Sequence, residues 1–130
     1  MSLVGKIIAW IVGGIVATVV VYLLFFLVIP YMRAPDTLNR TEAQVILTDE
    51  LAQYRVKPYR ELAGLVDDHT ARRVNGKSGA EYTVEVSFYW DGDPNEDVRV
   101  FASISDGGKS AYIPMTASFI KSPNGQFVGE

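Results

Sequence analysis

Apolar residues dominate the first part of the chain and alternate with polar residues in most of the remainder. The run from Ile7 to Ile29 holds 23 consecutive residues without a charged side chain. As a helix rising 1.5 Å per residue, this run spans about 34 Å, which is enough to cross a hydrocarbon layer about 30 Å thick. A buried helix of a soluble protein keeps a polar face, which this run lacks. The pattern therefore predicts a transmembrane helix.

A cleaved signal peptide is the main alternative for an apolar run near an N-terminus. Its apolar core is only about 7–15 residues long and is followed by a cleavage site of the small-x-small type. The residues that follow the run here, Pro30 to Pro35, contain no convincing site of this kind. We therefore expect a retained anchor, with Trp10 and Tyr31 at the two membrane interfaces and with both prolines ending the helix.

Small residues recur at a spacing of four within the predicted anchor. Gly13 and Ala17 form one such pair, and Gly14 and Thr18 form a second. Pairs of this kind let another helix backbone approach closely, so these four residues are a candidate helix-packing interface. Glycine and alanine are also common in membrane helices for no such reason, and the pattern alone leaves both interpretations open.

The charges that flank the anchor indicate its orientation only weakly. Lys6 precedes the run, whereas Arg33 and Arg40 follow it, so the positive-inside count is close to a tie. A short basic tail ahead of a long apolar run is typical of a signal anchor. This arrangement places the domain outside the cytoplasm.

The rest of the chain begins with a helical pattern. The expected parts are an anchor over residues 1–33, a short polar linker over 34–40 and one extramembrane domain over 41–130. Thr41-Glu-Ala-Gln44 matches a capping box, and apolar residues at helical spacing then predict a helix over 41–54. Pro58 favours the start of a second short helix that runs to Val66.

After the helices the hydrophobic period changes from 3.6 to 2, which is typical of half-buried strands. The predicted strands are residues 69–74, 82–90, 98–104 and 110–120. Asn75-Gly76 predicts the turn after the first strand, and Pro114 predicts an edge or a bulge in the last. The sequence thus predicts an α+β fold in which one or two helices pack on an antiparallel meander of about four strands.

Charge and composition exclude several classes of function. Lys6 and Arg33 lie before residue 34, so ten of the twelve Lys and Arg and all fifteen Asp and Glu lie in residues 34–130, for a net charge of −5. This balance argues against a nucleic-acid partner and gives no reason to expect docking on anionic lipid. The chain has no cysteine, so disulfides, thiolate catalysis and Cys-ligated metals are excluded.

The chain has one histidine, His69, beside Asp67 and Asp68. A general base needs a nucleophile or a substrate pocket as well, and no such set accompanies it in the sequence. A surface histidine at a helix–strand junction is the simpler interpretation. We therefore expect no catalytic residue and no enzymatic activity.

Two other motifs resemble ligand sites. The loop from Asp91 to Asp97 matches the first half of a calcium loop, but Glu96 and Ala102 stand where an EF-hand needs Gly and Glu. An acidic hairpin loop is the simpler interpretation, and weak calcium binding stays open. The Gly-Lys-Ser sequences at 76–78 and 108–110 lack the earlier glycine and the following helix of a phosphate loop. We expect neither a cofactor nor a resident metal.

Aromatic residues suggest a contact surface on the predicted sheet. Tyr89 and Phe101 fall on the face opposite the stripe from Tyr82 to Trp90, so both faces of the sheet carry apolar side chains. Tyr89 and Phe101 are therefore a candidate partner face. Burial under residues 34–58 explains the pattern equally well.

The sequences Ser105-Asp-Gly-Gly108 and Phe119 to Glu130 resemble a small, uncharacterised bacterial domain family over roughly residues 59–130. The resemblance implies no activity. The order of anchor, helix and small sheet is similar in architecture to that of a family of cytochrome-oxidase assembly factors, but the Leu-Gly-x-Pro-Ile stretch of that family is absent.

These observations lead to an expectation about function. We expect a non-catalytic, single-pass accessory or assembly subunit of a larger membrane complex, respiratory or photosynthetic, in the bacterial inner membrane. Its partners would be other integral membrane subunits and the lipid bilayer. The alternative is a membrane-tethered module that binds a peptide or ligand through an exposed sheet edge.

Overall fold

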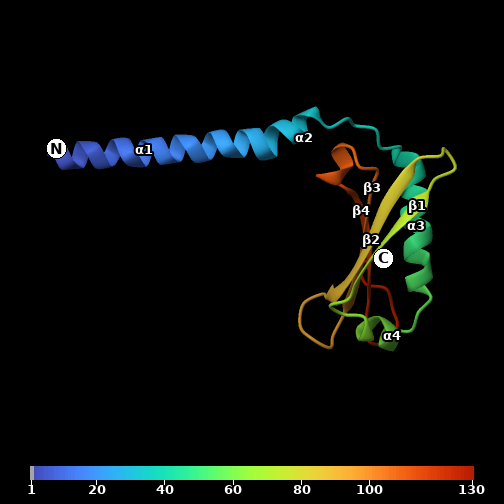
Figure 1. The fold of residues 1–130 in the computed structure, drawn as a ribbon. Helices are drawn as coiled ribbons and strands as arrows, with labels where there is room; N and C mark the ends of the chain where they lie inside the picture. The colour runs from blue at the N-terminus through green and yellow to red at the C-terminus, as the bar shows by residue number, and fades with distance from the viewer. Residues whose placement is uncertain (1) are drawn as a thin grey trace. The chain divides into compact units, whose positions relative to one another are not determined.

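The computed structural model describes residues 2–130, which divide into two compact units that meet between Pro35 and Asp36. The first unit is one continuous helical rod (Figure 1). It consists of α1 (Leu3–Leu23), a π-helical turn (Leu24–Val28) and α2 (Ile29–Arg33). Ser2 caps its start by accepting a hydrogen bond from the backbone N–H of Gly5.

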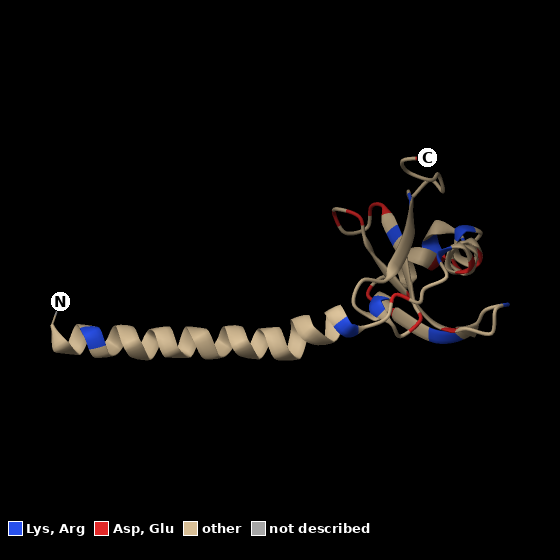
Figure 2. Ribbon diagram, turned by 90° about the horizontal axis from the view of Figure 1, so that it is seen from above, with Lys and Arg blue, Asp and Glu red and all other residues tan. Residues whose placement is uncertain are grey.

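The rod is long and apolar enough to cross a membrane by its length and composition. It covers 31 residues near the N-terminus, a position that it shares with signal sequences, and its apolar side chains from Leu3 to Val28 are exposed. Figure 2 shows basic residues near its two ends and neutral residues between them. These basic residues are Lys6 and Arg33. The predicted helix is therefore present and extends four residues beyond each end of the apolar run from Ile7 to Ile29.

The prediction that Pro30 ends this helix is wrong, because the π-helical turn accommodates it. Proline has no N–H to donate and its ring crowds the preceding turn. Here Ile29 donates its N–H to the oxygen of Leu24, five residues back, which widens the helix just before the proline. The helix ends instead at Ala34, whose extended backbone is the conformation favoured before Pro35.

The second unit confirms the α+β prediction. Its elements are α3 (Arg40–Arg55), α4 (Tyr59–Gly64), β1 (His69–Asn75), β2 (Glu81–Trp90), β3 (Val98–Ser105) and β4 (Met115–Lys121). The strands form an antiparallel meander in the order β1-β2-β3-β4. Figure 1 shows α3 along one face of this sheet, where it packs mainly on β3 and β4.

The core lies between α3 and the sheet. Even-numbered residues of β2 and β3 point toward the helices, because side chains alternate between the two faces of a strand. The buried apolar side chains are Ala43, Leu47, Leu51, Leu62, Tyr82, Val84, Val86, Phe88, Val98, Val100, Ala102, Ile104 and Phe119. Tyr54 adds an edge-on ring contact to Phe88 with 5.1 Å between the ring centroids. This one-sided core leaves the other face of the sheet without a layer of its own.

The start of α3 differs from the predicted capping box. The N-cap is Asn39, whose side-chain oxygen accepts a 3.1 Å hydrogen bond from the backbone N–H of Glu42. Thr41 lies inside the helix and is exposed. Asparagine is a strong N-cap because it satisfies one of the free N–H groups of the first turn, and it precedes the threonine in the chain.

Two boundaries of the sheet also differ from prediction. A five-residue connection, Gly76–Ala80, joins β1 to β2 and is closed by a 2.8 Å hydrogen bond between the N–H of Gly76 and the oxygen of Ala80. The last strand begins at Met115 and not at residue 110, because residues 109–111 form a 3₁₀ turn. Pro114 therefore precedes the strand, where its missing N–H disturbs no ladder.

A buried lysine fixes the C-terminal end of α3 to β4. Lys121 is 8% exposed, and its Nζ donates to the backbone oxygens of Arg55 at 3.1 Å and Lys57 at 2.7 Å. Its Nζ also lies 5.2 Å from the ring centroid of Phe127. Carbonyl groups at a helix C-terminus have no partner within the helix and carry partial negative charge, so an ammonium group stabilises them.

Candidate functional site

The small-residue stripe of the anchor is exposed in the first unit. Gly13, Gly14, Ala17 and Thr18 all lie on the surface of α1, and no other side chain approaches the two glycines within 4 Å of an added Cβ. Thr18 donates its hydroxyl hydrogen to the oxygen of Gly14 at 2.8 Å, so its polar group is satisfied within the helix. The stripe can therefore pack against a neighbouring helix without first breaking an internal contact.

The face of the sheet opposite α3, here called the open face, holds both aromatic residues predicted for it. Tyr89 and Arg99 are directly opposite each other on β2 and β3, and Ile120 of β4 is opposite Arg99 on the other side. Phe101 follows in the next row, between Ser87 and Ser118. Tyr89 is 40% exposed and Phe101 is half-buried. Three strands thus each place one apolar residue on the same face, with Arg99 between Tyr89 and Ile120, and these three residues are here called the apolar cluster.

Residues 34–58 do not cover this cluster, because α3 packs on the opposite face. The arginine of the cluster is held in place: Arg99 donates from Nε to Asp91 at 2.9 Å and from Nη1 to Ser118 at 3.1 Å. The rest of the open face is rich in hydroxyl groups, contributed by Thr83, Ser87, Ser103, Ser105, Thr116 and Ser118. Apolar and aromatic side chains with a polar surround are the composition of many protein interfaces.

The first strand leaves one edge of the sheet free. Among the strands of residues 36–130, β1 pairs only with β2, and all its residues except Val74 are exposed. Gly76 and Ala80 form a hydrogen-bonded pair in the same register, so even-numbered residues of β1 bond to β2. Ala71 and Arg73 therefore direct their backbone N–H and C=O groups away from the sheet. This free edge can accept an additional strand.

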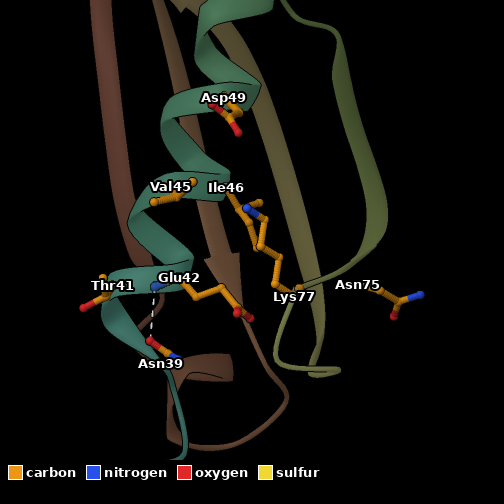
Figure 3. Close-up of a pocket in the computed structure, with 9 residues that line it drawn as sticks. Asn39, Thr41, Glu42, Val45, Ile46, Asp49, Asn75 and Lys77 are labelled. Atoms are coloured by element: carbon orange, nitrogen blue, oxygen red, sulfur yellow. Dashed lines mark hydrogen bonds between the residues drawn. The ribbon is translucent and has the colours of Figure 1, made fainter.

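A groove of about 480 Å³ lies between α3 and the turn that joins β1 to β2 (Figure 3). Its lining includes Val45, Ile46 and Asp49 from α3 and Asn75, Gly76 and Lys77 from the strand and turn. Figure 3 shows the Lys77 side chain extending along α3 toward Ile46, whereas Asn75 points away from the helix. The groove is open and combines an apolar floor with the ammonium group of Lys77 and the carboxylates of Glu42 and Asp49.

The carboxylate of Glu42 closes one end of this groove. It accepts hydrogen bonds from the N–H of Ser78 at 3.0 Å, from the Ser78 hydroxyl at 2.7 Å and from the Tyr82 hydroxyl at 2.8 Å. The hydrogen bonds from Ser78 and Tyr82 lower the pKa of Glu42. An added Cβ at Gly76 would lie 1.8 Å from the carboxylate oxygen, so only glycine lets the carboxylate approach the turn this closely.

An ion pair joins α3 to β1 farther along the same side. Glu50 is 4% exposed and accepts hydrogen bonds from Nε and Nη2 of Arg72, the former at 3.1 Å. Because α3 packs mainly on β3 and β4, this pair is a principal polar link between the helix and the edge strand. The side chain of Arg72 remains about half exposed.

Asp106 organises the end of the domain at which the linker arrives. Its carboxylate accepts hydrogen bonds from Thr37 at 2.5 Å, from the hydroxyl of Ser110 at 2.6 Å and from the N–H of Gly108 at 3.1 Å. Burial acts to raise the pKa of Asp106, but the hydrogen bonds from Ser110, Thr37 and Gly108 outweigh it and hold the pKa below its usual value. The loop after β3 is thereby tied to the linker.

Both Gly-Lys-Ser sequences form turns that bind a carboxylate of the same chain. Ser78 of the first binds the carboxylate of Glu42, and Gly108 and Ser110 of the second bind that of Asp106. Backbone N–H groups of a turn and a serine hydroxyl are suited to any anion. Here the anion is in each case a carboxylate of the same chain.

The remaining candidates do not come together into a site. His69 is exposed at the start of β1, and its Nδ1 lies 3.0 Å from the hydroxyl oxygen of Ser87. In the loop Asp91–Asp97, Asp91 is engaged by Arg99. Over residues 2–130, His, Asp and Glu side chains form no cluster of three or more that could hold a metal ion.

Comparison with known proteins adds no relative. No family model, no curated protein and no solved structure matches the chain.

Sequence reasoning missed the contacts of Glu42, Glu50, Asp106 and Lys121. Glu42, Lys121 and the Thr37 bond of Asp106 join residues that are at least 36 positions apart. Glu50 and Arg72 are 22 positions apart, and the other bonds of Asp106 are local. The signal for two of them was present, since a glycine followed by lysine and serine predicts a turn with free donors. Which carboxylate would occupy each turn depends on the packing of α3 and the linker.

Proposed function

We propose that this chain is a single-pass membrane protein that acts as a non-catalytic accessory or assembly subunit of a larger membrane complex. The observation that supports this proposal best is the open face of the sheet. Tyr89, Phe101 and Ile120 form an apolar cluster on it, and α3 and the main core lie on the opposite face of the sheet. A partner protein that covers this cluster would complete the second layer of the fold.

The anchor supports the same proposal in the plane of the membrane. Lipid chains are as apolar as leucine side chains, so helices associate in a bilayer through close backbone packing. The small-residue stripe offers that packing and is accessible along α1. Two contact surfaces, one in each unit, suit a subunit that joins an assembly better than an isolated protein.

The location proposed for this subunit is the bacterial inner membrane, with residues 36–130 outside the cytoplasm. Respiratory and photosynthetic complexes are the assemblies to test first. The short basic tail before the apolar run supports the orientation.

A second candidate function rests on the free edge of β1. An extended peptide can add to such an edge through main-chain hydrogen bonds, with side chains entering a neighbouring groove. The groove beside Val45 and Ile46 lies next to this edge. In this alternative the chain is a membrane-tethered binding module, and its ligand contacts β1 instead of the open face.

Purification of the full chain in a mild detergent from its native membrane tests the proposal. We expect defined membrane proteins to co-migrate with it, and Tyr89→Lys to weaken their recovery by placing a charge within the apolar cluster. Val56→Lys is a matched control, since Val56 is exposed at the end of α3 and away from the open face. Recovery of the chain alone as a monomer would refute the proposal.

The helix stripe is tested in the same preparation. Replacing Gly13 and Gly14 together with leucine should reduce co-purification, because the larger side chains hold a neighbouring backbone away. The matched control replaces Val12 and Val19, on the opposite side of the helix, with leucine. Equal recovery from both pairs of variants would exclude the stripe as an interface.

A further inference from the structure

The loop between β3 and β4 differs from the other connections of the domain. Residues 111–114, Ala-Tyr-Ile-Pro, are four consecutive exposed positions without a charged side chain. Tyr112 is 52% exposed and Ile113 is 65% exposed. The connections Gly76–Ala80 and Asp91–Asp97 are made of polar residues, glycine, alanine and proline. A run of exposed apolar residues in a surface loop is unfavourable in water and often marks a contact surface.

This loop lies at the end of the domain where the linker arrives. The hydrogen bond between Thr37 and Asp106 ties the linker to the residue that immediately follows β3. Leu38, the next residue of the chain, already packs against the core. Thr37 is therefore held on the domain, and only residues 34–36 separate it from the last residue of α2.

The length of that connection bounds the distance from the domain to the end of the anchor. Thr37 is four residues beyond Arg33, and four residues span at most about 14 Å when fully extended. The anchor has the length and composition to cross a bilayer, and Arg33 follows its apolar part directly. Wherever the anchor leaves the hydrocarbon layer, Thr37 and the loop tied to it are within reach of the lipid headgroups.

Charge is distributed unevenly between the two ends of the domain. The distal end, where β2 meets β3 and α4 meets β1, carries an excess of carboxylates. Figure 2 shows acidic residues in red on this distal loop. The loop holds Asp91, Asp93, Glu96 and Asp97, and Asp67 and Asp68 lie between α4 and β1 at the same end. Lys57, Arg60 and Arg99, which pairs with Asp91, offset part of this charge. The linker end carries Arg40, Lys77 and Lys109 against Asp36, Glu42 and Asp106. An anionic membrane therefore repels the distal end more than the linker end, although the whole domain is acidic.

We propose that the β3–β4 loop contacts the membrane surface, with Tyr112 and Ile113 entering the headgroup region. Tyrosine is enriched at this depth because its ring is apolar and its hydroxyl group is polar. The occupant of the exposed loop is lipid and not a further protein. This contact leaves the open face and the free edge of β1 accessible to partners.

The inference rests on the anchoring part of the proposed function, and the experiment separates the two. The chain has no cysteine, so a single introduced cysteine carries a nitroxide label at one chosen position. The full chain is reconstituted into vesicles of equal parts phosphatidylcholine and phosphatidylglycerol. Collisions of the label with membrane-soluble oxygen and with a water-soluble nickel chelate are then measured for Ala111→Cys, Asp93→Cys and Ile15→Cys.

We expect the label at residue 15 to favour oxygen, the label at residue 93 to favour the chelate, and the label at residue 111 to be shielded from the chelate. Adding Tyr112→Ser and Ile113→Ser should raise chelate access at residue 111 to the level at residue 93. If Tyr112 and Ile113 are unchanged and the chelate reaches residues 111 and 93 equally, the proposed contact is wrong, whereas the membrane anchor is still supported. Chelate access at residue 15 would overturn both the anchor and the contact.

Discussion

The buried ammonium group of Lys121 provides the sharpest test of how α3 is held on the sheet. Lys121→Met keeps most of the aliphatic length and removes the charge. The change deletes two hydrogen bonds, of 3.1 and 2.7 Å, to the backbone oxygens of Arg55 and Lys57. A hydrogen bond from a charged donor contributes about 1.5–3 kcal/mol, and relief of the buried charge offsets part of the loss. We expect the free energy of unfolding to fall by about 2–3 kcal/mol.

Urea unfolding of the full chain in detergent micelles measures this change through the fluorescence of Trp90, which packs against the core. The anchor remains in the micelle, so Trp10 adds a nearly constant signal. With a slope of about 1–1.5 kcal/mol per molar urea for a domain of this size, the midpoint should fall by about 2 M. Lys77→Met, the same change at an exposed lysine, should alter stability by less than about 0.5 kcal/mol. Equal midpoints for the two variants would refute the assigned role of Lys121.

Three further measurements test other contacts. Arg72→Met should destabilise the domain by about 1–3 kcal/mol because it leaves the buried carboxylate of Glu50 unpaired. Adding Glu50→Met should restore part of this stability, and equal stability of the single and double variants would contradict the reasoning. The lowered pKa of Asp106 contributes stability that is present above its unfolded pKa of about 4 and is lost as pH falls through the lower folded pKa. Asp106→Asn should therefore flatten the acid side of a stability–pH curve, and an unchanged curve would exclude this contribution. Val16→Arg should cost about 2.5–3.5 kcal/mol of membrane insertion and increase the fraction extracted at alkaline pH, whereas equal extraction of both proteins would argue against a spanning helix.

Periodicity determined the kind of each element but not all of its ends. The alternation along Glu81–Trp90 and Val98–Ser105 predicted two central strands, because one face of each is buried. The predicted start of the last strand was wrong because Lys109 and the residues after it form a turn that Asp106 organises. In the anchor, the sequence predicted that the helix ends at Pro30, whereas a single π-helical turn before this residue keeps the helix continuous.

By itself, the sequence determined that the chain contains a helix long and apolar enough to span a membrane and an α+β domain, because hydrophobic spacing is a local property of the chain. It also placed Tyr89 and Phe101 on one face. Only the tertiary structure decided that α3 packs on the other face and leaves these two residues accessible. It alone showed that Thr37 is bound to Asp106, which places an exposed apolar loop beside the linker. Such contacts join residues far apart in the chain, and their choice depends on how the helix and sheet pack together.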